Sequence, residues 1–155
     1  MTTTMRIERA RATRREIKAV LGLIDEASTW LRSKDTDQWT EPWPDRKMRD
    51  SRVRRGLKVG KTWIVWERNI PVATVTIAEQ PNVRVWSASG CDLSERAVYV
   101  HRLIAARNYA GWGLGAELID WAGLRQGDPQ SRLPRSGVIW PSAGLPGVAG
   151  SLRWA

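Results

Sequence analysis

The sequence has little of what would mark a secreted, metal-binding or membrane protein. Cys91 is the single cysteine among 155 residues, which excludes an intrachain disulfide and a cysteine-cluster metal site. No apolar run approaches the ~20 residues that a membrane helix needs. The first five residues, Met-Thr-Thr-Thr-Met, lack the apolar core of a secretory signal. We therefore expect a cytoplasmic protein with no membrane partner and no metal.

Phenylalanine is absent, and the aromatic residues are instead ten tryptophans and two tyrosines. The core must therefore be built largely from indoles, and each buried indole N–H needs an acceptor.

Acidic residues are also few, since 25 Lys and Arg against 16 Asp and Glu give a formal net charge of +9. This surplus favours anionic partners, either nucleic acid or a phosphate-rich cofactor.

Eight of the basic residues crowd between positions 46 and 61. They alternate with Met48, Val53 and Leu57, whose spacing would turn them toward a core. The stretch is thus expected to be the solvated face of a helix. A nucleic-acid-binding surface is the alternative. It ranks last because no zinc motif or stacking platform accompanies the charges.

Hydrophobic periodicity and capping residues predict the order of helices and strands. Thr13 and Asp45 are suitable N-caps, and Gly60 ends the second helix. The expected elements are a strand at 5–9, a helix at 14–32, a helix at 46–58, a hairpin of strands at 62–67 and 71–78, a strand at 97–105 and a helix at 114–124.

The strongest chemical signal is a strand, a glycine-rich turn and a helix between Tyr99 and Ala122. Gly111, Gly113 and Gly115 alternate at the start of the helix, where unpaired N–H groups and the helix dipole favour an anion. The segment lacks the Lys-Ser/Thr of a P-loop and the spacing of a dinucleotide fingerprint. It is consistent with a phosphate cradle or with a tight structural turn.

The same segment, with the order strand, long helix, second helix and hairpin before it, resembles the GCN5-related N-acetyltransferases (GNAT family). The likeness covers residues 5–125 and implies an α+β fold, a mixed and mostly antiparallel sheet flanked by helices. It also implies acetyl-CoA as acyl donor, with no metal. By the resemblance, the backbone of three strand residues pairs with the pantetheine arm, and the amides of the turn hold the pyrophosphate. The implied cofactor-binding residues are Leu103, Ile104, Ala105, Gly111, Trp112, Gly113, Leu114, Gly115 and Ala116.

The chain departs from the family pattern in several places. Ala110 stands where the family often has Arg or Gln, and Ala105 where Val is usual. After Arg125 the likeness stops, so we divide the chain into a GNAT-like acyl-CoA-binding domain (1–125) and an irregular tail (126–155). The fold is therefore expected to be incomplete or altered at the C-terminus. The tail reads as a truncated or out-of-frame second half; the alternative is that residues 137–140 form a substitute strand beside Val100.

Catalytic residues are not identified by the sequence. His101 is the only histidine and would share a strand face with Leu103, so it could be a general base or a packed structural residue, and we favour the latter. Asp37 and Glu41 could line an acceptor pocket or shape a turn. Trp39 and Trp43 could form an acceptor wall or plain core. The family's tyrosine acid has no counterpart, because no Tyr follows Tyr109.

Three functions are consistent with these residues. The first is transfer of an acetyl group from acetyl-CoA to an amine of an unknown small molecule or protein. The second is a non-catalytic protein of the same ancestry that binds CoA weakly or not at all. The third is the basic nucleic-acid-binding module. Without the closing strands, turnover is expected to be poor, and an exposed sheet edge would favour a homodimer or aggregation.

Overall fold

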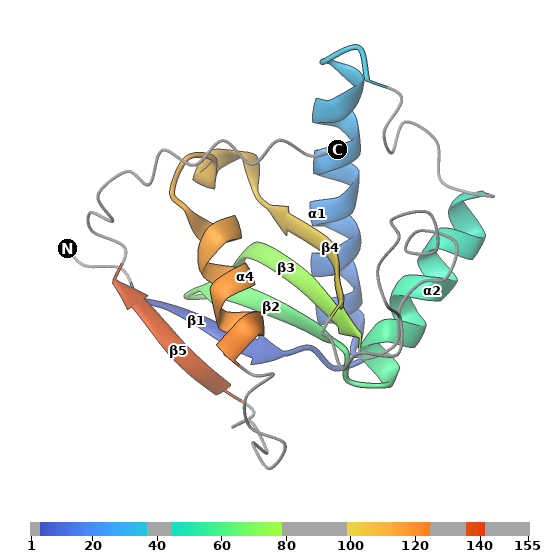
Figure 1. The fold of residues 1–155 in the computed structure, drawn as a ribbon. Helices are drawn as coiled ribbons and strands as arrows, with labels where there is room; N and C mark the ends of the chain where they lie inside the picture. The colour runs from blue at the N-terminus through green and yellow to red at the C-terminus, as the bar shows by residue number, and fades with distance from the viewer. Residues whose placement is uncertain (1–3, 37–44, 79–98, 125–135, 142–155) are drawn as a thin grey trace, which may run out of the picture.

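The computed structural model describes residues 4–36, 45–78, 99–124 and 136–141 (Figure 1). The elements are β1 (Thr4–Arg9), α1 (Arg14–Arg32), α2 (Arg46–Lys58), β2 (Thr62–Glu67), β3 (Ile70–Ala78), β4 (Tyr99–Ala105), the 3₁₀ turn η2 (Arg107–Tyr109), α4 (Leu114–Leu124) and β5 (Ser136–Pro141). The predicted order from the first strand to the last helix is confirmed. The part of the predicted strand at 97–98 lies outside the described residues.

Both long helices begin at the predicted caps. The Thr13 hydroxyl accepts the Glu16 N–H at 3.2 Å and donates to the Glu16 carboxylate at 2.6 Å, a reciprocal arrangement that fixes the first turn of α1. The Asp45 carboxylate accepts the Met48 N–H at 2.8 Å at the start of α2. Met48 itself is 45% exposed, so the expectation that it faces the core is wrong, whereas Val53 and Leu57 are buried as expected.

The described strands form one antiparallel sheet in the order β4-β3-β2-β1-β5. The predicted hairpin is present as β2 and β3, joined at Glu67 and Ile70 across the two-residue turn Arg68-Asn69. β4 lies at one edge of this sheet and β5 at the other. The alternative for the tail, a substitute strand at residues 137–140 beside Val100, is right about the strand and wrong about its partner, because β5 pairs with β1 at the far edge.

Helices cover both faces of the sheet and enclose two apolar clusters (Figure 1). α4 closes one cluster, the α4 core: Met5, Ile7, Trp63, Val65, Val72, Ala73, Val75, Leu114, Leu118, Trp121 and Ala122. α1 and α2 close the other, the α1 core: Ala10, Val20, Leu23, Ile24, Val53, Leu57, Ile64, Trp66 and Ile104. Because both faces are covered, β2 is buried along five of its six residues and reads as a continuous apolar run.

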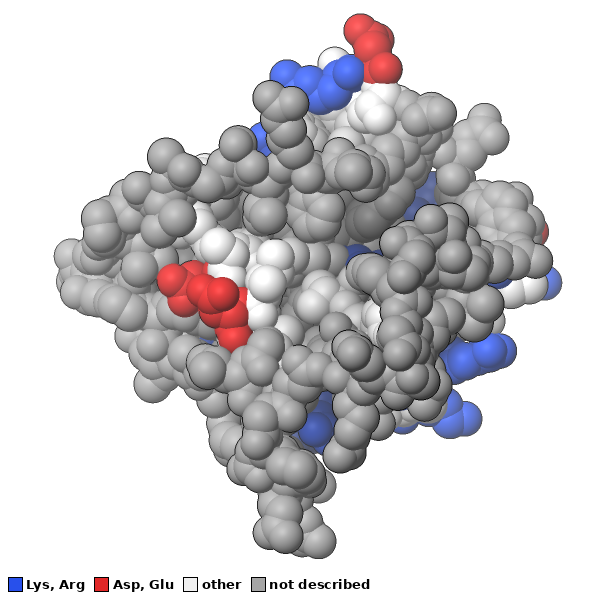
Figure 2. All heavy atoms as spheres, viewed as in Figure 1, with Lys and Arg blue, Asp and Glu red and all other residues white. Residues whose placement is uncertain are grey.

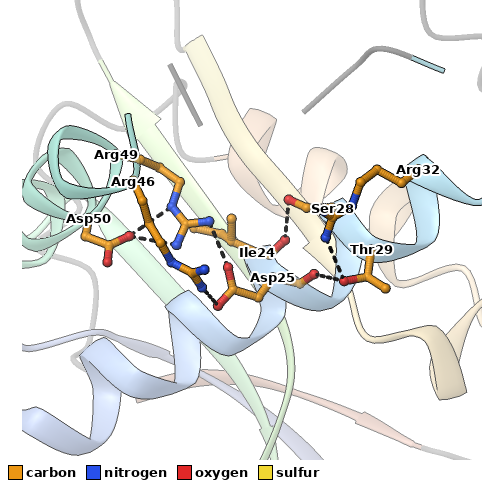
Figure 3. Close-up of polar contacts among 8 residues, drawn as sticks. All are labelled: Ile24, Asp25, Ser28, Thr29, Arg32, Arg46, Arg49 and Asp50. Atoms are coloured by element: carbon orange, nitrogen blue, oxygen red, sulfur yellow. Dashed lines mark hydrogen bonds and ion pairs between the residues drawn. The ribbon is translucent and has the colours of Figure 1, made fainter. Parts of the chain in front are cut away.

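An ion-pair network joins the two helices on the α1 side (Figure 3). Asp25 of α1 accepts from Arg49 and from Arg46 of α2, each at 2.8 Å, and Arg49 also contacts Asp50 at 2.7 Å. The Arg49 side chain is only 15% exposed, and these two carboxylates raise its pKa against the effect of burial. The pairing fixes one part of the predicted basic face, while Arg46, Lys47, Arg52, Arg54, Arg55 and Lys58 are exposed.

Within the described ranges, no helix is long and apolar enough to cross a membrane. The same ranges contain no group of three or more His, Cys, Asp or Glu side chains placed to hold a metal ion.

Candidate functional site

A β-bulge interrupts β4, the edge strand that the sequence analysis singled out. Thr74 pairs with Ile104 and Thr76 with His101, so Arg102 and Leu103 together oppose only Val75. Arg102 adopts a positive φ of 48°, a conformation that side-chain-bearing residues rarely adopt. Bulges of this kind are frequent at sheet edges beside functional sites, where they re-aim side chains.

The bulge changes which side chains share a face. Val100 and Leu103 both pack against the α4 core, although an uninterrupted strand would place them on opposite faces. His101 alternates with Val100 and therefore lies on the α1 side, opposite Leu103. The expectation that His101 and Leu103 share a face is wrong. It assumed that side chains alternate regularly along β4, and the extra residue of the bulge breaks this alternation between His101 and Leu103.

Beyond the bulge, backbone groups of β4 point outward from the edge of the described sheet. The Ala106 N–H donates to the Val72 carbonyl at 2.8 Å, which makes Ala106 and Val72 a hydrogen-bonded pair. Bonded and non-bonded pairs alternate in antiparallel sheets, so the N–H and C=O of Ala105 point away from β3. Among the described residues no strand pairs with this edge. The strand can therefore accept an extended ligand as an added strand.

The glycine-rich turn that follows has an open backbone. Gly111 and Gly113 have φ values of 83° and 77°, in the region where glycine alone avoids steric strain. A Cβ built at Gly111, Gly113 or Gly115 would meet no atom of the described residues within 4 Å. Packing therefore does not demand glycine at these positions. At Gly111 and Gly113 the positive φ is what requires glycine. The open space beside the turn lets a ligand approach the backbone closely.

The turn leads into the start of α4, whose first backbone N–H groups have no acceptor within the helix. The Glu117 N–H closes the first helical turn on the Gly113 carbonyl at 3.1 Å. The N–H groups of Gly113, Leu114, Gly115 and Ala116 precede it and have no helical acceptor. Together with the positive end of the helix dipole, these four donors make the start of α4 a candidate anion-binding site.

Three contacts hold the segment between β4 and the turn in place. The Arg107 N–H donates to the Glu26 carboxylate of α1 at 3.1 Å, and the Arg107 guanidinium lies 3.9 Å from the Trp30 ring centroid. The Tyr109 hydroxyl donates to the Glu67 carboxylate at the end of β2, which raises the pKa of Tyr109 to about 12. These anchors were not predicted, since their partners lie far apart in the sequence.

Side-chain charge near the start of α4 is acidic. Figure 2 shows acidic side chains gathered over α4, which carries Glu117 and Asp120. Ala110 supplies no cation, and the Arg107 guanidinium is stacked on Trp30. A phosphate at this terminus would therefore be held by backbone N–H groups. Trp112, 43% exposed, borders the turn and packs beside Tyr109 with ring centroids 5.2 Å apart.

His101, the candidate general base, is half-buried. Burial and the neighbouring Arg102 guanidinium lower the pKa of His101, so its imidazole is neutral near pH 7 and able to accept a proton. Burial and Arg52 of α2 likewise lower the pKa of Arg102. The other sequence candidates, Asp37, Glu41, Trp39 and Trp43, lie outside the described residues.

Known proteins resemble this chain in sequence and in fold. Residues 26–122 match the family model of the acetyltransferase (GNAT) family. The uncharacterized N-acetyltransferase YesJ of Bacillus subtilis is 26% identical over 107 residues, which span 69% of this chain and 58% of that relative. The match thus covers little more than half the length of this relative.

Two crystal structures of GNAT-family acetyltransferases share the fold. The protein from Streptococcus agalactiae has a TM-score of 0.61 and 22% identity, covering 81% of this chain and 70% of its own. The protein from Listeria monocytogenes has a TM-score of 0.60 and 18% identity, covering 77% and 67%. The family match spans more than half of the chain and includes the bulged strand, the glycine turn and most of α4, and on this evidence the chain belongs to the GNAT acetyltransferase family.

Proposed function

We propose that the chain binds acetyl-CoA and transfers its acetyl group to an amine. The observation that carries the proposal is the start of α4. Four backbone N–H groups, from Gly113 to Ala116, begin at the second of two glycines with positive φ, and the described residues leave open space beside the turn. These donors would hold the pyrophosphate. The outer edge of β4, through Leu103, Ile104 and Ala105, would pair with the pantetheine arm. The register favours Ala105 as the residue whose backbone groups face the ligand.

The chemistry is direct acyl transfer without a metal. The amine nitrogen attacks the thioester carbonyl carbon, a C–N bond forms and the C–S bond breaks. The amine gives up a proton, and the departing thiolate takes one up. Backbone N–H groups at the edge strand would stabilise the developing oxyanion. His101 is neutral and could accept the amine proton, directly or through water.

A thermal-shift titration with acetyl-CoA tests the binding step. A ligand at 100 times its dissociation constant stabilises the folded state by about 2.7 kcal/mol, a shift that is readily measured. Gly113→Val should abolish the shift, because the branched side chain fills the approach to the amides and cannot adopt the φ of 77° without strain.

Gly60→Val is the matched control. Gly60 also has a positive φ, 72°, but it lies between α2 and β2, where an added Cβ would meet the flexible Arg9 side chain. Both variants should lose about 1–2 kcal/mol of stability to backbone strain, and only Gly113→Val should lose acetyl-CoA. An unchanged acetyl-CoA affinity in a folded Gly113→Val protein would remove the assignment.

A second candidate is a CoA-binding protein without turnover. The family match ends at residue 122, and the sequence beyond Tyr109 has no tyrosine to serve as the acid. Release of free thiol from acetyl-CoA in the presence of an amine panel distinguishes the two. Binding without thiol release would favour this second candidate.

The proposed division at residue 125 has a direct test. Gln126-Gly127-Asp128-Pro129 is consistent with an out-of-frame reading of the family's second half. Reading the coding DNA in its other two frames beyond Arg125 should then reveal an in-family continuation with Asn and Tyr. If neither frame does so, the tail is a genuine variant. The proposed setting is the cytoplasm. Gel filtration tests whether the chain forms a homodimer.

A further inference from the structure

A cavity separate from the start of α4 lies on the α1 side of the sheet. Its volume is about 500 Å³, within the range of small-ligand sites. α1 forms one wall, the β2–β3 turn a second, and the segment from Ala106 to Tyr109 a third. Arg15, Lys18 and Gly22 are exposed, so the cavity opens to solvent along α1.

Gly22, on the α1 wall of the cavity, is a glycine that packing does not require. It lies in the middle of a 19-residue helix, where glycine costs about 1 kcal/mol relative to alanine. A Cβ at this position would meet no atom of the described part of the chain within 4 Å. Packing against the neighbouring described segments therefore does not require glycine at this position. The missing side chain leaves the cavity wider.

Trp66 supplies a second, independent observation. This indole lines the cavity and is only 2% exposed, yet its Nε1–H has no hydrogen-bond partner in the described structure. A buried donor left unpaired costs about 1–3 kcal/mol. An acceptor atom that reached this N–H would remove that cost. The Arg15 guanidinium lies over the same ring at 4.6 Å from its centroid.

The charged groups of the cavity favour an anion at the Arg15 end. Arg15 uses one N–H on the Asn69 side-chain oxygen at 3.3 Å and has further donors to offer. Lys18 lies one helical turn beyond it on the same wall. Among the described lining residues, Glu26 is the one carboxylate, and it already accepts the Arg107 N–H at the other end of the cavity.

We propose that this cavity binds a small organic anion, a carboxylate or phosphate on an apolar body. The oxyanion would sit among Arg15, Lys18 and the Trp66 N–H, and the body would lie over Gly22 toward Ala106. The site is independent of the proposed acetyl-CoA function. It adjoins the acetyl-CoA site through the Ala106–Tyr109 segment and lies across the sheet from α4.

The test follows the Trp66 indole N–H by ¹H–¹⁵N NMR in the full chain, with its signal assigned through Trp66→Phe. Benzoate and phenyl phosphate are the anionic probes and distinguish a carboxylate from a phosphate site. Benzamide is the neutral probe of the same shape. We expect a saturable shift of the Trp66 signal with at least one anion, and binding of benzamide about tenfold weaker because charge-assisted contacts are lost.

Gly22→Leu is the blocking variant, and Gly22→Ala its control. Both replacements favour a helix, so both proteins should unfold at or above the wild-type temperature. Leucine should fill the cavity and weaken anion binding about tenfold or more, whereas alanine should leave most of it. Lys18→Gln should weaken the anions but not benzamide.

Three results would overturn the proposal. They are equal binding of benzamide and benzoate, undiminished binding in Gly22→Leu, and displacement of the anion by acetyl-CoA, which would make the cavity part of the acyl-CoA site. Loss of acetyl-CoA binding in Gly113→Val tests the proposed function separately. Either idea can therefore fail without the other.

Discussion

Replacing Tyr109 with phenylalanine tests how the glycine turn is held. Tyr109 ends η2, and its ring packs against the α4 core and beside Trp112. Its hydroxyl donates to the Glu67 carboxylate at the end of β2. Phenylalanine keeps the ring contacts and removes only this hydrogen bond, so the change isolates the anchor between the sheet and the turn.

The expected cost follows from the exposure of the pair. A hydrogen bond to a charged group contributes about 1.5–3 kcal/mol when well shielded. Tyr109 and Glu67 are both half-buried, so water competes for the carboxylate and we expect a loss of about 1 kcal/mol. The turn would also sample more conformations, and acetyl-CoA affinity should fall by about threefold to tenfold.

The pH dependence of this loss identifies its cause. The Glu67 hydrogen bond, then burial and the Glu67 charge, raise the pKa of Tyr109 to about 12, against about 10 for a free tyrosine. The folded state thus keeps the phenolic proton at a pH where the unfolded chain has lost it. The stabilisation is complete below about pH 10 and is lost as pH rises toward 12.

Urea unfolding of wild type and Tyr109→Phe at pH 8 and near pH 11.5 measures the effect. The difference between the two proteins should be about 1 kcal/mol at pH 8 and should shrink at the higher pH. Glu67→Gln retains an acceptor but removes the charge, and it should lose part of the same energy. A difference below about 0.3 kcal/mol at pH 8, or one that does not change with pH, would refute the reasoning.

Three further changes have defined expectations in urea unfolding. Asp25→Ala should cost about 1–2 kcal/mol because it leaves the largely buried Arg49 with only Asp50, whereas Arg46→Ala, which removes a 67% exposed partner, should cost under about 0.5 kcal/mol. Leu118→Ala should cost about 2–5 kcal/mol, since Leu118 is fully buried in the α4 core. Arg68→Gly should stabilise the protein by about 0.5–1 kcal/mol, because Arg68 is exposed and held at a φ of 55° in the hairpin turn.

The fold was predictable where its signals are local. Thr13 and Asp45 cap helices through hydrogen bonds to residues three positions away, so a short stretch of sequence contains the whole interaction. The hairpin needs only two apolar runs and a two-residue turn. The glycine turn and the start of α4 are equally local, which is why the candidate anion site could be located from the sequence.

Features that depend on distant partners were missed. β5 pairs with β1, more than 120 residues earlier, and its composition gave no indication of which edge it would join. The Tyr109–Glu67 and Arg107–Trp30 contacts join segments separated by long stretches of chain. The cavity beside α1 is formed by three such segments. In the sequence, Gly22 appears only as a helix-destabilising residue within an amphipathic helix.

The bulge at Arg102 shows how a single inserted residue limits inference about catalysis. Alternation along β4 predicts that His101 accompanies Leu103, yet the extra residue turns His101 to the α1 side while Leu103 stays with the α4 core. A base on the α1 side would meet an acceptor approaching between β4 and α2, where Arg52 and Arg102 also lie. If His101 is the base, the acceptor amine must therefore enter a basic environment. An amine that also bears a negative charge would be favoured there over a simple cation.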